Sequence, residues 1–259
     1  MIIEGTREGA SWWGIVKSRA AAGWWRLLLL ALVPLLAEWA VQFGGAAVRA
    51  PLAITLVLPV LVGVAVSAVV WAPKLEVLSG RRGLLGTAGA GVAVLAVALL
   101  VPQARRLVIT ASFLIPESAV GARSNVFATL VLPPGGAVLE LAALLGSLAL
   151  TLLPMAVLLE GAGVRRAWAV LRGDWRTVLR AVGITLIPAM VSSLVLSALI
   201  SSPAIGFDHA FVITMQLTQA LINALMDSVT AVLLYATWQR AAVVRGGNGA
   251  AREAVSAGV

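Results

Sequence analysis

The sequence predicts an all-α membrane protein, a polytopic helical bundle of about six transmembrane helices with one or two amphipathic helices at the membrane interface. Three observations predict this fold class. Of the 259 residues, 61% are hydrophobic and only 12% are charged. The apolar residues come in blocks of about 20, which is the length that crosses a bilayer. The basic residues gather in alternate connections between these blocks, as the positive-inside rule requires.

Six apolar blocks are long enough to be spans. We expect the spans at 24–44, 50–72, 84–102, 137–160, 181–200 and 212–237. They form a single membrane domain, 1–245, and the segment 246–259, rich in small residues, is expected to be a disordered cytoplasmic tail. The first block lacks the short apolar core and cleavage site of a signal peptide, so we expect it to remain as the first span.

The distribution of basic residues predicts the orientation. With the N-terminus inside, fifteen Arg and Lys residues fall in inner segments and four in outer segments, which places both termini in the cytoplasm. Nearly all of the 9 tryptophans lie near the predicted inner boundaries, where an amphipathic ring is favoured. Only Lys17 and Lys74 are lysines, and with the richness in Ala, Val, Leu and Gly this is typical of a GC-rich bacterial genome. We therefore expect a bacterial plasma membrane protein.

The stretch 164–182 is the stronger of two candidate interface helices. Its apolar residues recur at helical spacing: Val164, Trp168, Leu171, Trp175, Val178 and Val182. Its arginines occupy a separate arc: Arg165, Arg166, Arg172 and Arg176. Such a helix lies flat on a membrane, where arginines contact anionic lipid headgroups or a protein partner. Residues 9–23 form a weaker copy that leads directly into the first span.

The residue inventory excludes several kinds of chemistry. There is no cysteine and only one histidine, His209, so neither a thiolate site nor a histidine-based metal site is expected. The sequence has no phosphate-binding loop, no H-E-x-x-H motif and no G-x-S-x-G motif. We therefore expect no catalytic residue, no metal, no cofactor and no enzymatic activity. Membrane topology explains the basic excess, so no nucleic-acid partner is expected.

A polar seam along the last span is the sharpest feature. Five residues spaced by three or four share one face of that helix: Gln216, Gln219, Asn223, Asp227 and Thr230. An ionisable group inside a membrane helix is costly and usually faces a bundle interior or a wet cavity. The seam is either a path for a proton, ion or substrate or a set of interhelical hydrogen bonds, and both interpretations stay open. Arg240 or the arginines of 164–182 are expected to neutralise Asp227.

A second polar seam lies on the fourth span. Glu140, Ser147 and Thr151 share a face of that helix by the same spacing argument. If the fourth and sixth spans touch, the two seams jointly line a cavity. The sequence leaves open whether these spans are neighbours.

Two further acidic residues lie near the ends of predicted spans. Glu38 lies beside Trp39, toward the outer edge of the first span, and is expected at the interface, where a charge costs little. Glu160 ends the fourth span, just before the basic stretch 164–182, and is expected to pair with Arg165 or Arg166. Both are therefore predicted to have structural roles.

The segment 158–176 carries a family resemblance. It reads as a span ending in Glu160-Gly161, then an amphipathic stretch through Arg165-Arg166-Ala167-Trp168 to Trp175-Arg176, and the last span ends in Leu234-Tyr235. This pattern resembles the membrane domain associated with bacterial glycerophosphodiester phosphodiesterases, which also occurs alone. The resemblance implies a stand-alone membrane domain of undefined role. It does not imply phosphodiesterase activity, because that soluble barrel needs histidines and metal-binding carboxylates that no segment here supplies.

These observations favour a non-enzymatic multi-pass membrane protein, an accessory or permease-like subunit that acts through lipid or protein partners. A transport ATPase is one such partner, because the segment 161–180 has the character of a cytoplasmic coupling helix. The alternative is a small secondary transporter or ion-coupled carrier that uses Asp227 with Gln219, Asn223 and Glu140. A carrier would lose transport on Asp227→Asn while folding normally, whereas a structural seam would lose stability or show no effect.

Overall fold

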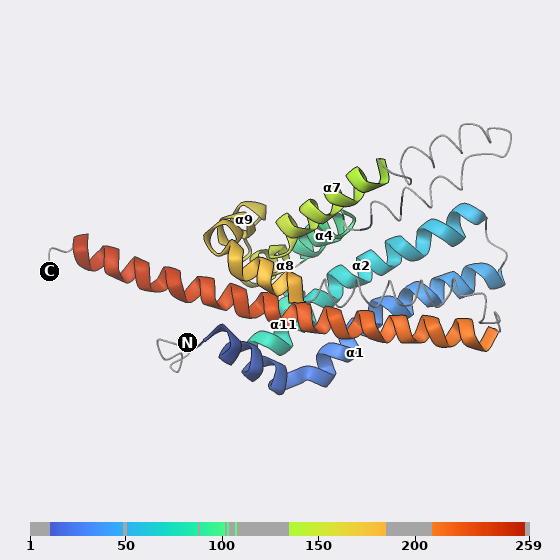
Figure 1. Cartoon of the computed structure of the whole chain (residues 1–259), viewed down its shortest axis with the longest axis horizontal. Helices are drawn as coiled ribbons and strands as arrows, with labels where there is room; N and C mark the ends of the chain where they lie inside the picture. The colour runs from blue at the N-terminus through green and yellow to red at the C-terminus, as the bar shows by residue number, and fades with distance from the viewer. Residues whose placement is uncertain are drawn as a thin grey trace.

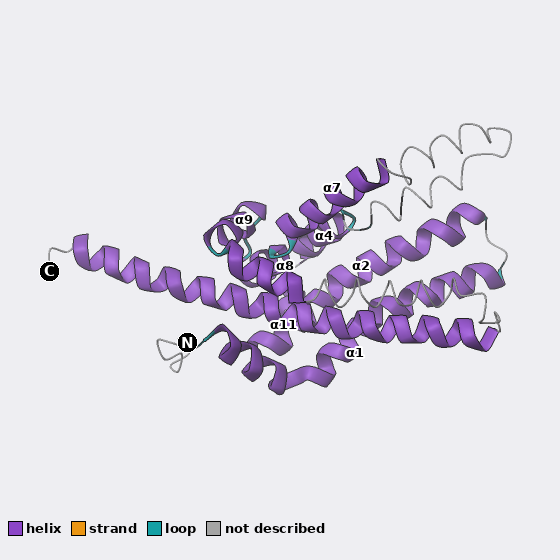
Figure 2. Cartoon of the chain, in the orientation of Figure 1, coloured by secondary structure: helices purple, strands orange, loops and turns teal. Residues whose placement is uncertain are grey.

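The structure, a computed structural model, describes residues 11–48, 51–87, 89–101, 103, 107, 135–184 and 209–256. Every regular element in these ranges is a helix (Figure 2). Three helices are long and apolar enough to cross a membrane: Trp12–Gly45, Val57–Ser79 and Leu217–Ala242. The prediction of an all-α fold with transmembrane helices is thus confirmed for this part of the chain. Most of the predicted span 181–200 and of the outer connection 103–136 lies outside the described residues.

The three long helices lie side by side. They are α1 (Trp12–Ala47), α2 (Leu52–Ser79) and α11 (His209–Ser256). α1 and α2 follow one another as an antiparallel pair, and α11 runs along both of them (Figure 1). The predicted spans 24–44 and 212–237 fall within α1 and α11. α11 is helical as far as Ser256, through most of the segment that we expected to be a disordered tail.

α1 consists of two helical segments joined at a kink. Gly23 has non-helical backbone angles, with φ −165° and ψ 25°. A Cβ at Gly23 would lie 2.4 Å from Cγ1 of Val77, so a side chain there would require Val77 or the backbone to shift. Ser11 caps the first segment, because its Oγ accepts a hydrogen bond of 3.1 Å from the backbone N–H of Gly14. The kink falls where the interface stretch 9–23 was predicted to join the first span.

Among the described residues, a set of shorter helices packs beside the long ones. They are α3 (Leu84–Thr87), α4 (Gly89–Leu99), α7 (Gly135–Leu150), α8 (Leu153–Glu160) and α9 (Val164–Gly173). α4 and α8 contact α2 and each other, and α9 contacts α7, α8 and α11 (Figure 1). The predicted span 84–102 contains α3 and α4, and residue 88 between them lies outside the described residues.

The predicted span 137–160 is broken into α7 and α8. The break falls at Thr151 and Leu152, directly before the first turn of α8, which contains Pro154. Proline has no N–H and its ring crowds the preceding turn, so it is tolerated at the start of a helix but interrupts a continuous one. The last turn of α7 tightens accordingly, and the Thr151 N–H donates to the Leu148 carbonyl at 3.3 Å.

The buried core lies toward one end of the bundle. It centres on residues 68–78 of α2 and 231–238 of α11, and every residue from Ala231 to Trp238 is buried. Leu153, Met155 and Ala156 of α8 complete it. The preceding part of α11 is different, because Leu217, Leu221 and Leu225 are exposed there. α11 thus passes from exposed leucines at 217–225 to full burial at 231–238.

Candidate functional site

An ion pair joins α2 to α11 at the edge of the buried core. Lys74 Nζ donates to Asp227 Oδ2, and the two residues are 153 positions apart in the sequence. The Lys74 side chain is only 3% exposed, whereas that of Asp227 is 40% exposed. The Lys74 ammonium also lies 5.3 Å from the centroid of the Trp71 ring, one helical turn earlier on α2. A lysine buried this deeply needs a negative partner, and Asp227 supplies it.

The pairing corrects the expected partner of Asp227. Arg240, one of the expected partners, instead lies 3.7 Å from Asp174 Oδ2, near the start of the helical stretch 175–184. Lys74 pairs with Asp227 because of where Lys74 lies on α2. α2 continues as helix to Ser79, so Lys74 lies on a helix within the bundle and not in the inner connection where the predicted end of the second span placed it.

The other members of the seam on α11 mostly bond within their own helix. Gln219 Nε2 donates to Asn223 Oδ1 at 2.8 Å, and Thr230 Oγ1 donates to the Met226 carbonyl at 2.7 Å. The Gln216 side chain lies outside the described residues. Asp227 is therefore the seam residue for which the structure describes a side-chain ion pair to another helix.

The second predicted seam, Glu140, Ser147 and Thr151, lies on α7 and at the break that follows it. Thr151 Oγ1, at the break after α7, donates to the Ser147 carbonyl in the last turn of α7 at 2.6 Å. The Glu140 side chain lies outside the described residues. The cavity beside Asn223 is lined, in the described part of the chain, by residues of α1, α2 and α11 and by Leu99 and Gln103, with no contribution from α7. A cavity shared by the two predicted seams therefore stays a prediction.

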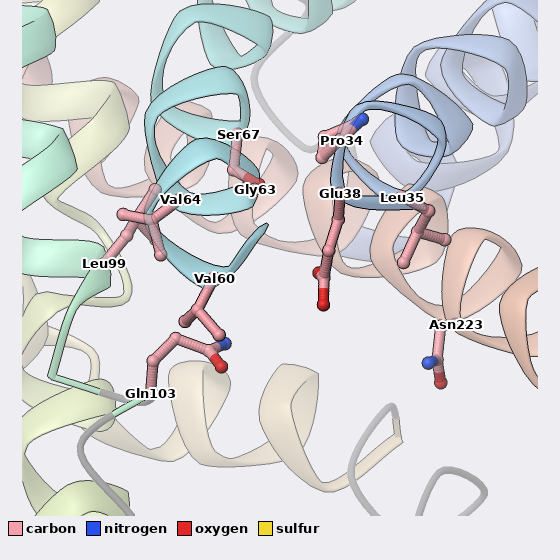
Figure 3. A pocket seen from close by; sticks show the side chains of 10 residues that line it. All are labelled: Pro34, Leu35, Glu38, Val60, Gly63, Val64, Ser67, Leu99, Gln103 and Asn223. Carbon is pink, nitrogen blue, oxygen red and sulfur yellow. The ribbon is translucent and has the colours of Figure 1, made fainter. Parts of the chain in front are cut away.

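A mixed polar and apolar cavity of about 270 Å³ opens between α1, α2 and α11. The Glu38 carboxylate extends from α1 into it, with Gly63 of α2 on one side and Asn223 of α11 on another (Figure 3). Sequence reasoning expected Glu38 at the membrane interface and did not predict that its carboxylate lines a cavity between distant helices. No pattern along the sequence indicates this cavity.

A glycine hinge turns the chain from α8 into α9 through 119°. Gly161 has φ 63°, a left-handed conformation that favours glycine, and it closes α8 with a hydrogen bond of 2.9 Å from the Ala162 N–H to the Ala156 carbonyl. Glu160 pairs with Arg166 through contacts of 2.6 and 3.2 Å, as predicted. Arg81, which follows α2, donates to the Leu159 carbonyl at 3.2 Å. Side-chain contacts therefore hold the chain before the bend, at Leu159, and after it, at Arg166.

Beyond the hinge, the helical register differs from the predicted one. The stretch 164–182 is not one helix, because Asp174 has non-helical angles and separates α9 from the helical residues 175–184. The predicted apolar face is consequently divided. Val178 is fully buried, with Ala167 and Val170, whereas Trp168 and Trp175 are 45% and 53% exposed.

Three of the four arginines in this region are exposed, as are those two tryptophans. Arg165, Arg172 and Arg176 are exposed, and the Arg176 guanidinium lies 5.7 Å from the centroid of the Trp175 ring. Arg166 is held more closely, since it also lies 5.8 Å from the Trp238 ring. We call Trp168, Trp175, Arg165, Arg172 and Arg176 the α9 surface. It combines exposed indole rings with positive charge, which is the composition of a membrane-interface helix.

The first segment of α1 packs against the middle of α11. Trp12 Nε1 donates to Thr237 Oγ1 at 3.2 Å in a buried position, and the Arg19 guanidinium lies 5.7 Å from the Tyr235 ring. The sequence predicted Trp12 as part of an interfacial belt. The structure instead assigns it a packing role inside the protein.

In the described part of the chain, no group of three His, Asp or Glu residues is placed to hold a metal ion. No family model, curated protein or solved structure matches the chain. The site must therefore be interpreted from its own geometry.

Proposed function

We propose that this chain is a non-enzymatic multi-pass protein of the bacterial plasma membrane that works at its cytoplasmic face as an accessory or permease-like subunit. One observation supports this most: exposed tryptophans and arginines lie on α9 and on the helical stretch 175–184, shortly after the turn at Gly161. Solvent-exposed indole rings are unfavourable in water and favourable among lipid headgroups. Such a surface gains free energy only when a headgroup layer or a protein partner covers it.

The proposal includes six spans, with both termini in the cytoplasm. α1, α2 and α11 supply three of them, and we assign a further, broken span to α7 and α8. In the proposed topology α9 lies flat on the inner membrane surface and is not part of that span. The basic connections, including Arg81, Arg82 and the arginines of α9, then share the inner face.

The first partner that we propose is anionic lipid. Arginine side chains near an anionic membrane surface contribute about 1 kcal/mol each. Arg165, Arg172 and Arg176 are exposed, so their guanidinium groups are accessible to phosphate oxygens. A transport ATPase that docks on the same surface is the proposed protein partner, and kinship with the membrane domain of glycerophosphodiester phosphodiesterases likewise stays a prediction.

Replacement of Arg165, Arg166, Arg172 and Arg176 with glutamine tests the lipid proposal. We expect the preference for spin-labelled phosphatidylglycerol over phosphatidylcholine, measured by electron paramagnetic resonance on reconstituted protein, to fall about tenfold or more. The matched control replaces the same four residues with lysine, which keeps the positive charge and should retain most of the preference. An unchanged preference in the glutamine variant would remove anionic lipid as the partner.

The alternative function, a small carrier, has one specific observation in its favour. The Lys74–Asp227 pair joins two of the helices that are long enough to cross a membrane, and Asp227 lies one helical turn from Asn223, which lines the polar cavity. Charge pairs in such positions also occur in proton and ion pathways. We prefer the proposal of an accessory subunit that acts at the cytoplasmic face, because Asp227 already serves to neutralise the buried Lys74.

A further inference from the structure

The packing of α1, α2 and α9 against α11 brings arginines from distant segments to one part of α11 (Figure 1). The Arg19 guanidinium lies 5.7 Å from the centroid of the Tyr235 ring. One helical turn later on α11, Arg166 lies 5.8 Å from the ring of Trp238. Arg81, in the connection after α2, lies near enough to the Tyr235 hydroxyl to act on it electrostatically, as Arg19 also does. Tertiary packing therefore gathers positive charge here, which spacing along one helix does not.

The carboxylates of Glu160 and Glu76, which belong to the same region, have other partners. Glu160 pairs with Arg166, and Glu76 accepts a hydrogen bond of 2.7 Å from a backbone N–H. Among the described residues, neither Arg19 nor Arg81 forms an ion pair with a carboxylate. Arg81 donates through one nitrogen to a backbone carbonyl, and Arg19 lies over a ring face. A guanidinium carries five N–H donors, so both arginines keep donors for another acceptor.

The Tyr235 hydroxyl adds a further donor to these arginines. Tyr235 is only 4% exposed, and Gln239 Nε2 donates a hydrogen bond of 3.0 Å to its phenolic oxygen. With the amide as donor, the phenolic proton remains to be donated, and no acceptor for it occurs in the described part of the chain. Buried polar groups are normally hydrogen-bonded. An acceptor held between Arg19 and Arg81 would satisfy this donor and both charges.

These donors match the chemistry of a phosphate group. Guanidinium groups bind phosphate oxygens through charge-assisted and often paired hydrogen bonds. Two positive charges balance the charge of about −1.5 to −2 that a phosphate monoester carries at pH 7, and they also exceed that of a diester. Arg19 and Arg81 both belong to predicted inner segments, where phospholipid headgroups and soluble phosphates are within reach.

We propose that Arg19 and Arg81, with the hydroxyl of Tyr235, bind a phosphate group at a site separate from the α9 surface. Two sources share this chemistry, the headgroup of an anionic phospholipid and inorganic phosphate. The location at the inner face rests on the proposed topology, whereas the binding chemistry does not. A bound phosphate links the first segment of α1 to the end of α2 beside α11, so occupancy is expected to stabilise the fold.

Thermal unfolding of the full chain in a neutral detergent, followed by circular dichroism, tests the proposal. Inorganic phosphate is added in one series, with chloride at equal ionic strength as its reference. Phosphatidylglycerol is added in the other, with phosphatidylcholine as its reference. We expect a saturable rise in Tm with at least one ligand, and the more effective one identifies the source. Arg19→Gln and Arg81→Gln should each weaken the apparent affinity about tenfold or more, because a charge-assisted contact is lost.

Matched variants separate this site from general surface charge. Lys17→Gln removes a positive charge from the same segment of α1, and Arg82→Gln removes one from the same connection after α2. Both residues are exposed, and neither variant should change the affinity. Tyr235→Phe keeps the ring beside Arg19 but removes the phenolic proton, so it should weaken binding about threefold or more.

The proposal is overturned if neither ligand gives a saturable rise in the wild-type protein. It is equally overturned if the rise persists undiminished in Arg19→Gln and Arg81→Gln, or if the two control variants reduce it as much. If Arg81→Gln does not fold, because its bond to the Leu159 carbonyl is lost, Arg19→Gln and Tyr235→Phe still decide the matter. Glutamine at the three arginines of the α9 surface should leave binding at Arg19 and Arg81 in place, so the two proposals can fail independently.

Discussion

Replacement of Asp227 with asparagine is expected to lower the free energy of unfolding by about 3 kcal/mol. Breaking a buried pair typically costs 3–5 kcal/mol, because the remaining charge is left uncompensated. Here the remaining group is Lys74, whose side chain is only 3% exposed. The low end of the range applies because Asp227 is itself 40% exposed and part of its interaction is screened. Unfolding in mixed micelles with an increasing fraction of sodium dodecyl sulfate measures the change.

The matched control removes both charges together. A Lys74→Met/Asp227→Leu double variant has no buried charge to leave unpaired, so it should recover most of the stability lost in Asp227→Asn. A double variant as unstable as the sum of the two single variants would show that the pair contributes nothing beyond its separate residues. The same protein distinguishes the functions: a carrier that works through Asp227 would lose proton flux into dye-loaded liposomes even with its fold restored.

The second large effect is expected at Trp12. Trp12→Ala should destabilise the protein by about 3 kcal/mol, because it removes a buried indole ring from the interface of α1 with α11. The variant also leaves Thr237 Oγ1 without the hydrogen bond that Trp12 donates. Circular dichroism during the same titration avoids dependence on tryptophan fluorescence.

Its control is the next residue in the chain. Trp13 is 49% exposed, against 5% for Trp12, and the two rings touch edge to face with centroids 4.9 Å apart. Trp13→Ala should therefore cost less than half as much. Equal losses in the two variants would mean that both tryptophans act as membrane-interface anchors, as the sequence alone indicated, and that the docking of the first segment on α11 is wrong.

The sequence was most informative about the helices and least about their interruptions. The apolar block length predicted helical spans within α1 and α11, because that length is set by the bilayer. Breaks within helices depend on single residues in context. Pro154 interrupts one predicted span, whereas Pro34, Pro59 and Pro73 lie inside α1 and α2 without ending them. No local rule distinguishes these prolines, since the neighbouring helices decide whether the lost hydrogen bond is tolerated.

The features of the candidate site that depend on local spacing were likewise predicted, and those that depend on the packing of distant helices were not. Helical spacing predicted the seam that contains Asp227, and adjacency predicted the pair between Glu160 and Arg166. Helical spacing also indicated an amphipathic stretch after Gly161, but a single non-helical residue at Asp174 changed which side chains are buried. The Lys74–Asp227 pair and the Glu38 cavity depend on how distant helices pack, which periodicity along one helix does not encode.

Native mass spectrometry of the protein, released gently from its own membrane, tests the central claim about the inner face most directly. We predict that the wild-type protein carries bound anionic phospholipid, or a stoichiometric protein partner, and that the variant with glutamine at Arg165, Arg166, Arg172 and Arg176 loses it. A wild-type protein that emerges bare, or a variant that retains the same ligands to the same extent, would contradict the account.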